Sequence, residues 1–583
     1  MPSEITPDHP DYKLTCLRHS AAHLMAHAIQ KLWPDAVFAF GPVVENGFYY
    51  DFQCSHSITP EDFKAIEAEM DALVKAKAPF EREEWPREKA EAFFAKAGQK
   101  FKVDQIQKLG LPSYSVYKEG DFIDLCRGPH VENTAPLRHI KLMNVSGATF
   151  RGEDKGIPLQ RVYGTAWETK EDLKAHLFRL EEAKKRDHRK LGTQLELFEF
   201  HSELSPGSAF WLPKGAALWR KLSDKTIDFH LREGYVEVRT PMVYNKKLWE
   251  TSGHWAHYQE NMFLIPDPEN ELNTMALKPM NCPGHMLVFG GKKRSYRELP
   301  MRLHDQSPLH RFERSGTLNG LLRVRNLCQD DAHIFVTEDQ IKDEVGRVLS
   351  MVKRLYSVFG LGFRCVLSTR PAKMMGDPAL WDKAEASLEA VLKDGQYEYR
   401  INPGDGAFYG PKIDFLVKDS LEREHQCATL QLDFQLPRNF DLKYTDDTNS
   451  EKTPIVIHRA LYGSFERFIA VLIEHYAGAF PMWLSPVQAR VIPVGQAHLD
   501  YASKVRDVLS ASKLRVDCDL SSDTLGAKLR GGKMAKIPYL LVVGDKEAEA
   551  GSVSWNQYGS DVKGTCTMEE FLAMVRPEAD LDY

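Results

Sequence analysis

The sequence has no hydrophobic run that could cross a membrane. None of its 583 residues lies in an apolar stretch near the length of about 18 residues that a membrane span needs, so we expect no membrane contact. The first residues, MPSEITPDHPDYK, lack the basic start and apolar core of a signal peptide. Nine cysteines are far apart and never form CxxC, which favours a reducing compartment. We therefore expect a cytoplasmic protein.

Positive charge is not in excess either. The 76 lysines and arginines stand against 82 acidic residues, a formal net charge of −6, which excludes a protein that coats nucleic acid by charge alone. No internal repeat or low-complexity tract is visible. The length predicts about three to four domains. An enzyme that binds nucleic acid through local basic patches remains compatible with this composition.

A mostly polar helix is predicted over residues 169–190. Leu173, Leu177 and Leu180 share one narrow stripe, and charged residues fill the other positions. Thr169 can cap its start, and Gly192 follows its basic end. Such a helix suits a linker between domains, although an ordinary surface helix has the same pattern.

The remaining pattern predicts an α+β multidomain protein. Residues 1–168 mix helices with short β-rich runs, and residues 191–484 alternate longer strand-like runs with helices, which fits a large, mainly antiparallel domain. Residues 485–583 alternate strand and helix regularly, as a small α/β domain with parallel strands does. We predict these three ranges as domains, joined by the 169–190 linker.

Arginines from separate segments are candidates for phosphate binding. Arg311, Glu313 and Arg323 fall in a strand–loop–strand setting, and Arg467 falls on a predicted helix. A guanidinium fork binds phosphate oxygens in bidentate fashion. The chain has neither a GxxxxGK[ST] loop nor a GxGxxG that opens a helix after a strand, so a nucleotide would depend on arginines. The alternative is a set of solvated charges on strand faces.

Longer segments around these arginines resemble one enzyme class. RFERSGTLNGLLRVRNLCQDDAHIF is similar to motif 2 of class II aminoacyl-tRNA synthetases, and IVIHRALYGSFERFIAVLIEH is similar to motif 3. EGYVEVRTPMVYNKKLWETSGHW, which contains Pro241, resembles motif 1, the dimer-interface element. ALKPMNCPGH, GAFYGPKIDF and LQLDF together resemble the threonyl-tRNA synthetase family, from about Tyr12 to the C-terminus.

The resemblance implies a complete activity and architecture. We expect a threonine–tRNA ligase that uses ATP to form threonyl-adenylate, transfers L-threonine to tRNA(Thr), and hydrolyses mischarged seryl-tRNA(Thr). The implied fold is a class II antiparallel-sheet catalytic domain between an N-terminal α+β editing domain and a C-terminal α/β anticodon-binding domain. A homodimer is implied by motif 1.

Cys282, His333 and His458 match the zinc ligands of that family. One zinc ion per subunit, held by three protein ligands, leaves room for substrate. A metal that chelates the amino and hydroxyl groups of threonine would reject valine, which an apolar pocket excludes by only about 10²-fold. Spacing alone does not find this set, and each residue alone is more simply a buried structural one. By spacing alone, His285, three residues after Cys282, would be a better second ligand beside Cys282 than His333 or His458.

The resemblance also assigns the other pocket residues. It implies that Arg311 binds the α-phosphate of ATP and that Arg467 stacks on adenine and reaches the γ-phosphate, with Mg²⁺ on the pyrophosphate. The implied threonine contacts are Gln329, Asp331 and Tyr409. The implied catalytic set is Arg311, Arg467, Arg323 and Lys412, and the ATP-binding set is Arg311, Glu313, Arg323, Gln426, Gln431 and Arg467.

A second constellation lies within residues 1–168. RHSAAHL places His19 and His23 on one helix face, and DLCRGPH offers Asp124, Cys126 and His130. HxxxH with CxxxH resembles the editing site of threonyl-tRNA synthetases. Serine passes a zinc filter because it also has an amino group and a hydroxyl, so a second hydrolytic site is the physical answer. The same side chains could hold zinc, as in alanyl editing domains, but the resemblance implies a metal-free site that orients water.

Some features depart from the family pattern. The resemblance starts near the editing helix, and no match to the ubiquitin-like domain of many bacterial members is expected in this sequence. Ser521, Ser522 and Asp523 stand where Arg-Asn-Glu is common, and Asn556, beside Trp555, stands where arginine is common. Fewer arginines weaken base and phosphate contacts, so the anticodon bases that are read stay open.

Two other functions remain open on the sequence. One is a paralogue that binds tRNA or a regulatory partner without charging, which the presence of the matched arginines and zinc ligands disfavours. The other is a free-standing enzyme that adenylates threonine for another carrier. An editing site would be unexplained in such an enzyme.

Overall fold

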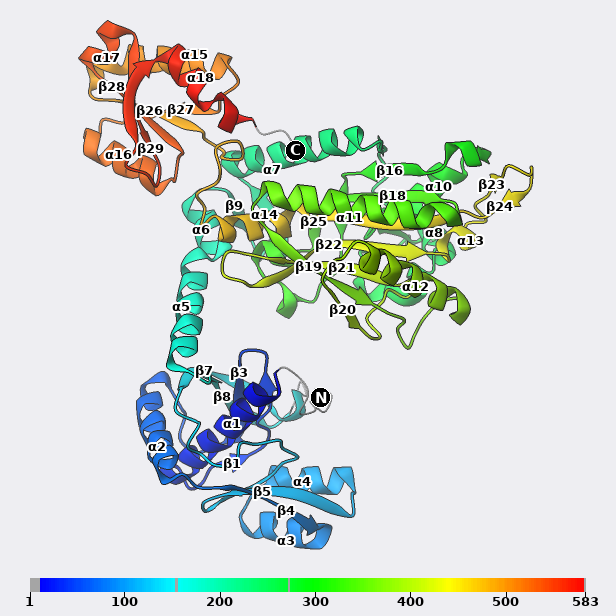
Figure 1. Ribbon diagram of the computed structural model, residues 1–583, viewed down its shortest axis with the longest axis vertical. Helices are drawn as coiled ribbons and strands as arrows, with labels where there is room; N and C mark the ends of the chain where they lie inside the picture. The colour runs from blue at the N-terminus through cyan, green and yellow to red at the C-terminus, as the bar shows by residue number, and fades with distance from the viewer. Residues whose placement is uncertain (1–10, 153–155, 271–272, 581–583) are drawn as a thin grey trace. The chain divides into compact units, whose positions relative to one another are not determined.

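The computed structural model describes residues 11–152, 156–270 and 273–580 (Figure 1). The chain divides into two compact units, Met1–Glu181 and Glu182–Tyr583. Within the described ranges, no helix combines the length and the apolar character that a membrane span requires.

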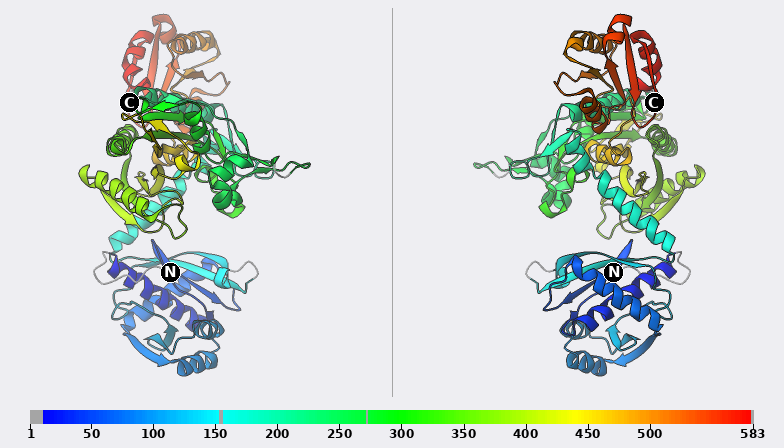
Figure 2. Two further views of the ribbon diagram at one scale, coloured as in Figure 1. Left: turned by 90° about the vertical axis from the view of Figure 1, so that its right-hand side faces the viewer. Right: turned by 90° about the vertical axis from the view of Figure 1, so that its left-hand side faces the viewer.

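The N-terminal unit is built around the buried helix α1 (Tyr12–Leu32). Its alanines, Met25, Leu17 and Leu24 are almost fully buried, and it packs on strands β3 and β8 of an antiparallel sheet (Figure 2). The sheet has the order β1-β3-β8-β7, and β2 pairs with β3. These strands are β1 (Val37–Phe38), β2 (Val43–Val44), β3 (Gly47–Gln53), β7 (Ile140–Thr149) and β8 (Pro158–Ala166).

A smaller α+β layer completes this unit. Its sheet has the order β4-β5-β6. The first of its helices, α2, packs on α1. The strands are β4 (Phe80–Pro86), β5 (Ser113–Glu119) and β6 (Phe122–Leu125), and the helices are α2 (Phe63–Ala76), α3 (Arg87–Lys96) and α4 (Lys100–Leu109). The α+β prediction for this part of the chain is confirmed.

The C-terminal unit contains a large, mainly antiparallel sheet. Its order is β11-β16-β18-β25-β22-β21-β19-β20, and β17 pairs with β18. Its strands are β11 (Val236–Glu237), β16 (Met301–Asp305), β17 (Pro308–His310), β18 (Asn326–Val336), β19 (Gly362–Ser368), β20 (Tyr399–Asn402), β21 (Lys412–Lys418), β22 (Glu424–Asp433) and β25 (Ile455–Ser464). Only the pairs β11–β16 and β19–β20 are parallel among the described strands of this sheet.

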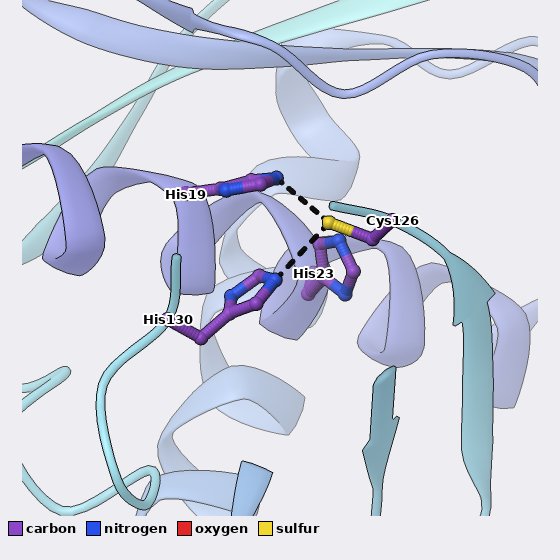
Figure 3. Close-up of side chains that lie close together, drawn as sticks. All are labelled: His19, His23, Cys126 and His130. Carbon is purple, nitrogen blue, oxygen red and sulfur yellow. Dashed lines mark hydrogen bonds between the residues drawn. The ribbon is translucent and has the colours of Figure 1, made fainter. Parts of the chain in front are cut away.

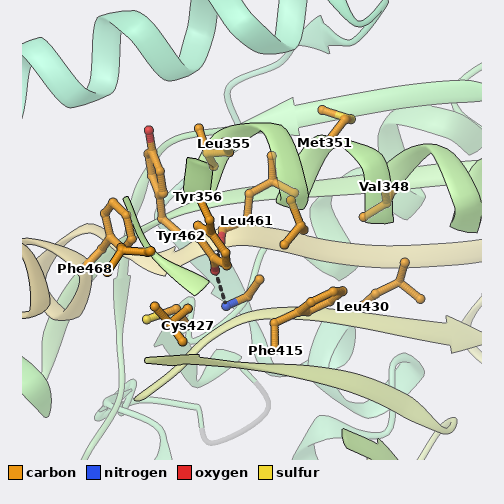
Figure 4. Packing of buried hydrophobic residues seen from close by; sticks show 14 of the residues in the cluster. Val348, Met351, Leu355, Tyr356, Phe415, Cys427, Leu430, Leu461, Tyr462 and Phe468 are labelled. Atoms are coloured by element: carbon orange, nitrogen blue, oxygen red, sulfur yellow. Dashed lines mark hydrogen bonds between the residues drawn. The ribbon is translucent and has the colours of Figure 1, made fainter. Parts of the chain in front are cut away.

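Amphipathic helices cover one face of this sheet. Helix α11 (Ile341–Val358) packs on β25, β22 and β19, and helix α14 (Phe465–His475) packs on β18 and β25. Tyr356 also bonds to the sheet, since its hydroxyl donates to the Leu461 carbonyl at 2.7 Å and accepts from the Ala428 N–H at 3.0 Å (Figure 4). The helices thereby bury the apolar face of the sheet, and the opposite, polar face is available for a functional site.

Other elements surround the large sheet. The helices are α7 (Pro213–Arg232), α8 (Lys246–Thr251), α9 (His254–Tyr258), α10 (Cys282–Gly290), α12 (Pro378–Asp394) and α13 (Leu436–Asn439). Short strands form small sheets: β9 (Phe198–Phe200), β10 (Ala209–Trp211), β12 (Val243–Asn245), β13 (Leu264–Ile265), β14 (Met275–Leu277), β15 (Arg294–Ser295), β23 (Tyr444–Thr445) and β24 (Glu451–Lys452).

The last part of the chain alternates strands and helices as predicted. Strands β27, β26 and β28 are parallel, and β29 and β30 extend the sheet in antiparallel fashion. The strands are β26 (Ala489–Pro493), β27 (Val516–Cys518), β28 (Tyr539–Val543), β29 (Ser552–Gln557) and β30 (Lys563–Thr567), and the helices are α15 (Leu499–Ala511), α16 (Leu525–Met534), α17 (Asp545–Ala550) and α18 (Met568–Ala579).

The single helix predicted over 169–190 is two helices. Helix α5 (Lys170–Arg186) begins as expected, since the Thr169 hydroxyl accepts from the Asp172 N–H at 3.1 Å. It ends before Asp187, whose carboxylate caps helix α6 (His188–Gln194) by accepting from the Arg189 N–H at 2.8 Å. A side chain that caps a new helix favours a break at that residue, which the apolar stripe alone does not reveal.

Candidate active sites

Alternate residues of β18 face opposite sides of the large sheet. Ala332 and Ile334 lie in the core under the helices, whereas Gln329, Asp331 and His333 line a cavity of about 530 Å³. Side chains of a strand alternate with a period of two, so one strand can serve both a core and a site. The cavity therefore lies on the polar face of the sheet.

Strand pairing brings three potential metal ligands together at this cavity. His333 of β18 is the register partner of His458 of β25, and Cys282 begins α10 beside them. The ligand atoms of these three residues lie within 4.8 Å of one another, and all three side chains are buried. One thiolate and two imidazoles are donors that suit zinc. Burial raises the pKa of the Cys282 thiol, and a cation would offset that cost.

Each histidine of the set has a hydrogen-bonding partner at one of its two ring nitrogens. Nδ1 of His333 is 2.8 Å from Nδ1 of His285, and Nε2 of His458 is 2.8 Å from the Asp433 carboxylate. Nε2 of His285 in turn lies 3.8 Å from Asp305. One ring nitrogen of each histidine thus stays available for a metal, and the other is oriented by a buried partner.

Two arginines in the cavity have no carboxylate partner among the residues that the structure describes. Arg311 donates to the Pro279 carbonyl at 3.3 Å, and Arg467 of α14 donates to the carbonyls of Leu322 and Gln426 at 3.0 Å each. Carbonyl oxygens orient a guanidinium but do not neutralise it. Two uncompensated positive charges in a concave site suit an anion such as phosphate.

Arg323 differs, because the Glu313 carboxylate accepts from it at 2.9 Å and 2.8 Å. Both residues line the same cavity, on the loop between β17 and β18. This pair confines the Arg323 side chain and lowers the net positive charge of the loop.

The remaining predicted residues of the cavity form a polar wall. The Asn281 amide donates to Asp331 at 3.0 Å, and the Tyr409 hydroxyl donates to the Gln431 side chain. Burial raises the pKa of Asp331, so its ionised form gains from a hydrogen-bond donor or a cation. Gln329 and Gln426 also line the cavity.

Lys412 is the one predicted residue of this set that does not line the cavity. Its ammonium group pairs with Asp414, which accepts from the Gln426 side chain at 2.7 Å, and with Asp405 at 3.2 Å. Lys412 is joined to the cavity through Asp414 and Gln426, and its register partner on β22 is the cavity residue Gln431. This position supports an orienting role.

The N-terminal unit contains a second cavity, of about 460 Å³, lined by His19, His23, Asp124 and Cys126. His19 and His23 project from the same face of α1, and Cys126 follows β6 (Figure 3). His130, four residues later, completes the cluster but does not line the cavity. The structure thus brings together the side chains of HxxxH and CxxxH.

Hydrogen bonds assign a direction to this cluster. The Pro129 carbonyl can only accept, so Nδ1 of a neutral His19, 3.2 Å away, donates to it and Nε2 is left as an acceptor. The Cys126 thiol then donates to Nε2 of His19 at 3.2 Å, and its sulfur accepts from Nε2–H of His130 at 3.2 Å. Nδ1 of His130 is left to accept from the Ser20 hydroxyl at 3.0 Å, and that hydroxyl also accepts from the Val131 N–H at 3.0 Å.

Burial keeps these groups neutral. It lowers the pKa values of His19, His23 and His130, and it raises the pKa of Cys126 to about 12. At neutral pH the histidines are therefore neutral imidazoles, and the cysteine is a thiol. A neutral imidazole can accept a proton from water.

Comparisons with known proteins identify the family of the chain. Family models match the tRNA synthetase class II core domain (G, H, P, S and T) at 263–476, an anticodon binding domain at 488–578, and the threonyl and alanyl tRNA synthetase second additional domain at 114–163. A threonine–tRNA ligase of Anaeromyxobacter dehalogenans strain 2CP-1 is 49% identical over 589 residues, which cover 99% of this chain and 90% of the relative. The chain belongs to the threonine–tRNA ligase family.

Other relatives support the family assignment. The threonine–tRNA ligase of Myxococcus xanthus is 48% identical over 579 residues, with 99% of this chain and 90% of the relative covered. The structure described as the RNA binding domain of threonyl-tRNA synthetase from Cryptosporidium parvum Iowa II matches with a TM-score of 0.66 and 42% identity. It covers 68% of this chain and 99% of its own. The α+β multidomain fold and the class II core are thereby confirmed.

Sequence reasoning about this family member missed Lys102. It lines the second cavity from α4, is 3% exposed, and pairs with Asp124 at 2.6 Å. Its ammonium group also donates to the Tyr50 hydroxyl at 3.0 Å, and Tyr50 donates to the other oxygen of Asp124. No local motif surrounds Lys102. The one feature of the sequence that could have indicated its role is a lysine at an apolar position of an amphipathic helix.

In the anticodon-binding domain of this family member, the unusual residues are accessible. Ser521 lies exposed after β27, and Asn556 lies partly exposed on β29. Trp555 is partly buried and packs on Tyr539, with ring centroids 6.1 Å apart. Trp555 is thus partly committed to the domain core, as expected for a sheet residue.

Proposed function

We propose that the chain activates L-threonine with ATP, transfers it to tRNA(Thr), and hydrolyses seryl-tRNA(Thr) at a separate site. One observation carries the proposal: a single cavity joins a buried Cys282–His333–His458 set to the uncompensated guanidinium groups of Arg311 and Arg467. If an amino acid binds at the Cys282–His333–His458 set and ATP binds at the two arginines, the carboxylate of the amino acid would lie beside the α-phosphate of ATP.

We infer that the domains are residues 1–168, 191–484 and 485–583, with 169–190 as the linker. The three family matches fall inside these ranges, which supports the division. The first would edit, the second would charge, and the third would bind the anticodon.

Cys282, His333 and His458 fit one zinc ion per subunit, because three soft or borderline donors converge and each histidine has a buried orienting partner. When bound, zinc would act as a Lewis acid that holds the amino group and the side-chain hydroxyl of threonine. Asp331, fixed by Asn281, would accept the hydrogen bond of that hydroxyl. Valine would leave this buried carboxylate without the hydroxyl donor, a defect that can cost about 10⁴-fold or more.

Adenylate formation needs charge and alignment from the chain. Arg311 would stabilise the charge that develops on the α-phosphate as the threonine carboxylate attacks and pyrophosphate leaves. Arg467 would hold adenine and the γ-phosphate, Arg323 would bind near the phosphates, and the enzyme uses Mg²⁺ with ATP, as class II synthetases do. Gln426 and Gln431 would complete the pocket, with Lys412 orienting Gln426 through Asp414.

The editing site would work with water and without metal. His19, Cys126 and His130 are already joined by hydrogen bonds, which supports a site of neutral groups, and the ligand atoms of these residues and His23 also lie close enough to hold a metal ion. His23 faces the cavity, with Nε2 3.5 Å from Asp124. A neutral His23, backed by Asp124, would take a proton from the water that attacks the seryl ester.

Replacing Lys102 with methionine is expected to slow seryl-tRNA(Thr) hydrolysis by about 10²-fold or more, since Asp124 would lose its buried cation and its orientation. The measurement is single-turnover deacylation of purified seryl-tRNA(Thr). Lys100→Met is the matched control, because Lys100 lies two residues away and its ammonium group contacts the Gln53 side chain and the Phe101 ring, outside the second cavity. Equal rates for both variants would contradict the role of Lys102.

A homodimer and a cytoplasmic location complete the proposal. Val236 on the edge strand β11, in the segment that resembles motif 1, is 58% exposed, and Leu231 at the end of α7, two residues before that segment, is 51% exposed. Exposed apolar residues at a sheet edge support a protein interface. The cysteines of the described chain are free thiols, which supports a reducing compartment.

The proposal is tested by aminoacylation. Purified chain, ATP, Mg²⁺ and a tRNA with a threonine anticodon are expected to give threonyl-tRNA. Threonine-dependent pyrophosphate exchange without charging would instead favour a free-standing activator. Binding of tRNA without either reaction would favour a non-charging paralogue.

A further inference from the structure

His188 is a buried histidine that neither proposed reaction uses. It begins α6, is 1% exposed, and has a partner for each ring nitrogen. Nδ1 lies 2.7 Å from the Glu474 carboxylate of α14, and Nε2 accepts from the Leu321 N–H at 3.1 Å. The His188 backbone N–H also donates to Glu474, at 3.0 Å.

The partners fix the tautomer of His188. Burial by itself raises the pKa of Glu474, but the hydrogen bonds from His188 and the charge of Arg423 outweigh it, so the net shift lowers this pKa. Glu474 is therefore an ionised acceptor, and a backbone N–H such as that of Leu321 can only donate. Nδ1 of His188 must carry the proton, and Nε2 must present its lone pair.

Asp187, His188 and Glu474 are close enough to hold a cation, but their donors are already engaged. Both ring nitrogens of His188 have partners, and Arg423 donates to the second carboxylate oxygen of Glu474 at 2.5 Å. The Asp187 carboxylate binds the backbone and side chain of Arg189. The cluster is a hydrogen-bonded junction and leaves no ligand set for a metal.

This junction fastens a turn of the nucleotide cavity to α14. Leu321 lies in the turn Gly320–Leu322, and the next carbonyl, that of Leu322, accepts from Nε of Arg467 at 3.0 Å. Helix α14 carries Arg467 in its first turn and Glu474 in its last. Gly320 has φ of +50°, and a Cβ there would meet Nε2 of His188 at 2.2 Å, so the turn approaches the imidazole closely.

We propose that His188 is a positioning residue for ATP. Its two hydrogen bonds hold the Gly320–Leu322 turn against α14, so that the Leu322 carbonyl aims the Arg467 guanidinium into the cavity. The inference rests on the proposed role of Arg467 in ATP binding. It assigns to the start of α6 a function that no motif of the sequence indicated.

Two substitutions separate the two hydrogen bonds. In His188→Asn the side-chain amide can replace Nδ1 and donate to Glu474, but nothing reaches the Leu321 N–H. In His188→Gln the longer side chain can place its carbonyl oxygen near the position of Nε2 and accept from Leu321. Lys190→Ala is the matched control, since Lys190 is an exposed residue of the same helix.

The experiment measures threonine-dependent ATP–pyrophosphate exchange on full-length variants. We expect His188→Asn and His188→Ala to raise KM for ATP by on the order of 10-fold, because an orphaned buried N–H destabilises the turn. KM for threonine should stay within about twofold, since the metal set does not contact this turn. His188→Gln should restore most of the ATP affinity.

Equal rises in both KM values, equal effects of Asn and Gln, or a loss of kcat with unchanged KM for ATP would each overturn the proposal. Thermal unfolding and seryl-tRNA hydrolysis by the other unit report whether the variants fold. If His188→Ala does not fold, the comparison of His188→Asn with His188→Gln still tests the proposal. Absence of exchange in the unmodified chain would refute the proposed function itself. Normal exchange with an unaltered KM for ATP in the variants would refute only the role of His188.

Discussion

Replacing Cys282 with alanine is expected to lower threonine-dependent ATP–pyrophosphate exchange by at least about 10²-fold and to release the zinc ion, because a misplaced substrate at a reacting centre costs that much. The thiolate is one of three ligands, and two imidazoles alone hold the metal weakly. Threonine would then lose the groups that fix its amino and hydroxyl ends. Metal content by mass spectrometry and exchange kinetics on the same samples are the two measurements.

Two further variants make the result specific. Cys365→Ala removes another buried thiol of the same unit, on β19 away from the cavity, and should retain both metal and exchange. His285→Ala should give an intermediate effect, with metal affinity lower by about 10- to 100-fold, because His285 orients His333 without being a ligand. Full exchange by metal-free Cys282→Ala would refute the zinc assignment. Two metal ions per unmodified chain would point to metal in the editing site as well.

The double variant His19→Ala with His23→Ala is expected to leave threonylation near its normal rate while seryl-tRNA(Thr) accumulates. Loss of an acid–base group costs about 10²- to 10⁴-fold in a proton-transfer step, so deacylation should fall by at least the lower figure. The charging site belongs to the other unit of the chain and keeps all its residues. Parallel assays with threonine and with serine on the same tRNA measure both effects.

His56→Ala is the control for this double variant. His56 belongs to the same unit, but it stacks on Trp33 and pairs with Asp62, outside the cavity. The His56→Ala variant should hydrolyse seryl-tRNA(Thr) at the rate of the unmodified chain. Rapid deacylation by the double variant would mean that residues 1–168 do not edit, and a parallel loss of threonylation would mean that the variant harms the fold as a whole.

Local periodicity explains which parts of the fold could be predicted. The final domain alternates strand and helix over short distances, and β26, β27 and β28 are parallel as expected. Likewise, HxxxH on α1 needs only the helical period of i and i+4 to place His19 beside His23. The break at Asp187 was missed because a capping side chain competes with helix continuation, and an apolar stripe carries no information about that competition.

The zinc set shows where such reasoning ends without a family. Cys282, His333 and His458 meet because β18 pairs with β25 in one register and α10 begins beside them. Strand register over this distance depends on packing of the whole sheet, so no local pattern specifies it. The family resemblance supplied the set, and it also rejected His285 as a ligand. The structure gives His285 a place of its own, against Nδ1 of His333.

The family, the order of the domains and the residue types that the chemistry needs could be predicted from the sequence, because motifs and hydrophobic periods are local properties of a chain. The contacts between distant groups depend on the three-dimensional fold. Lys102 reaches Asp124, Lys412 stands behind Gln426, and His188 joins α14 to the nucleotide turn. These contacts follow from burial, since a charged or hydrogen-bonding group inside a protein must find its partner in space, wherever that partner lies in the chain.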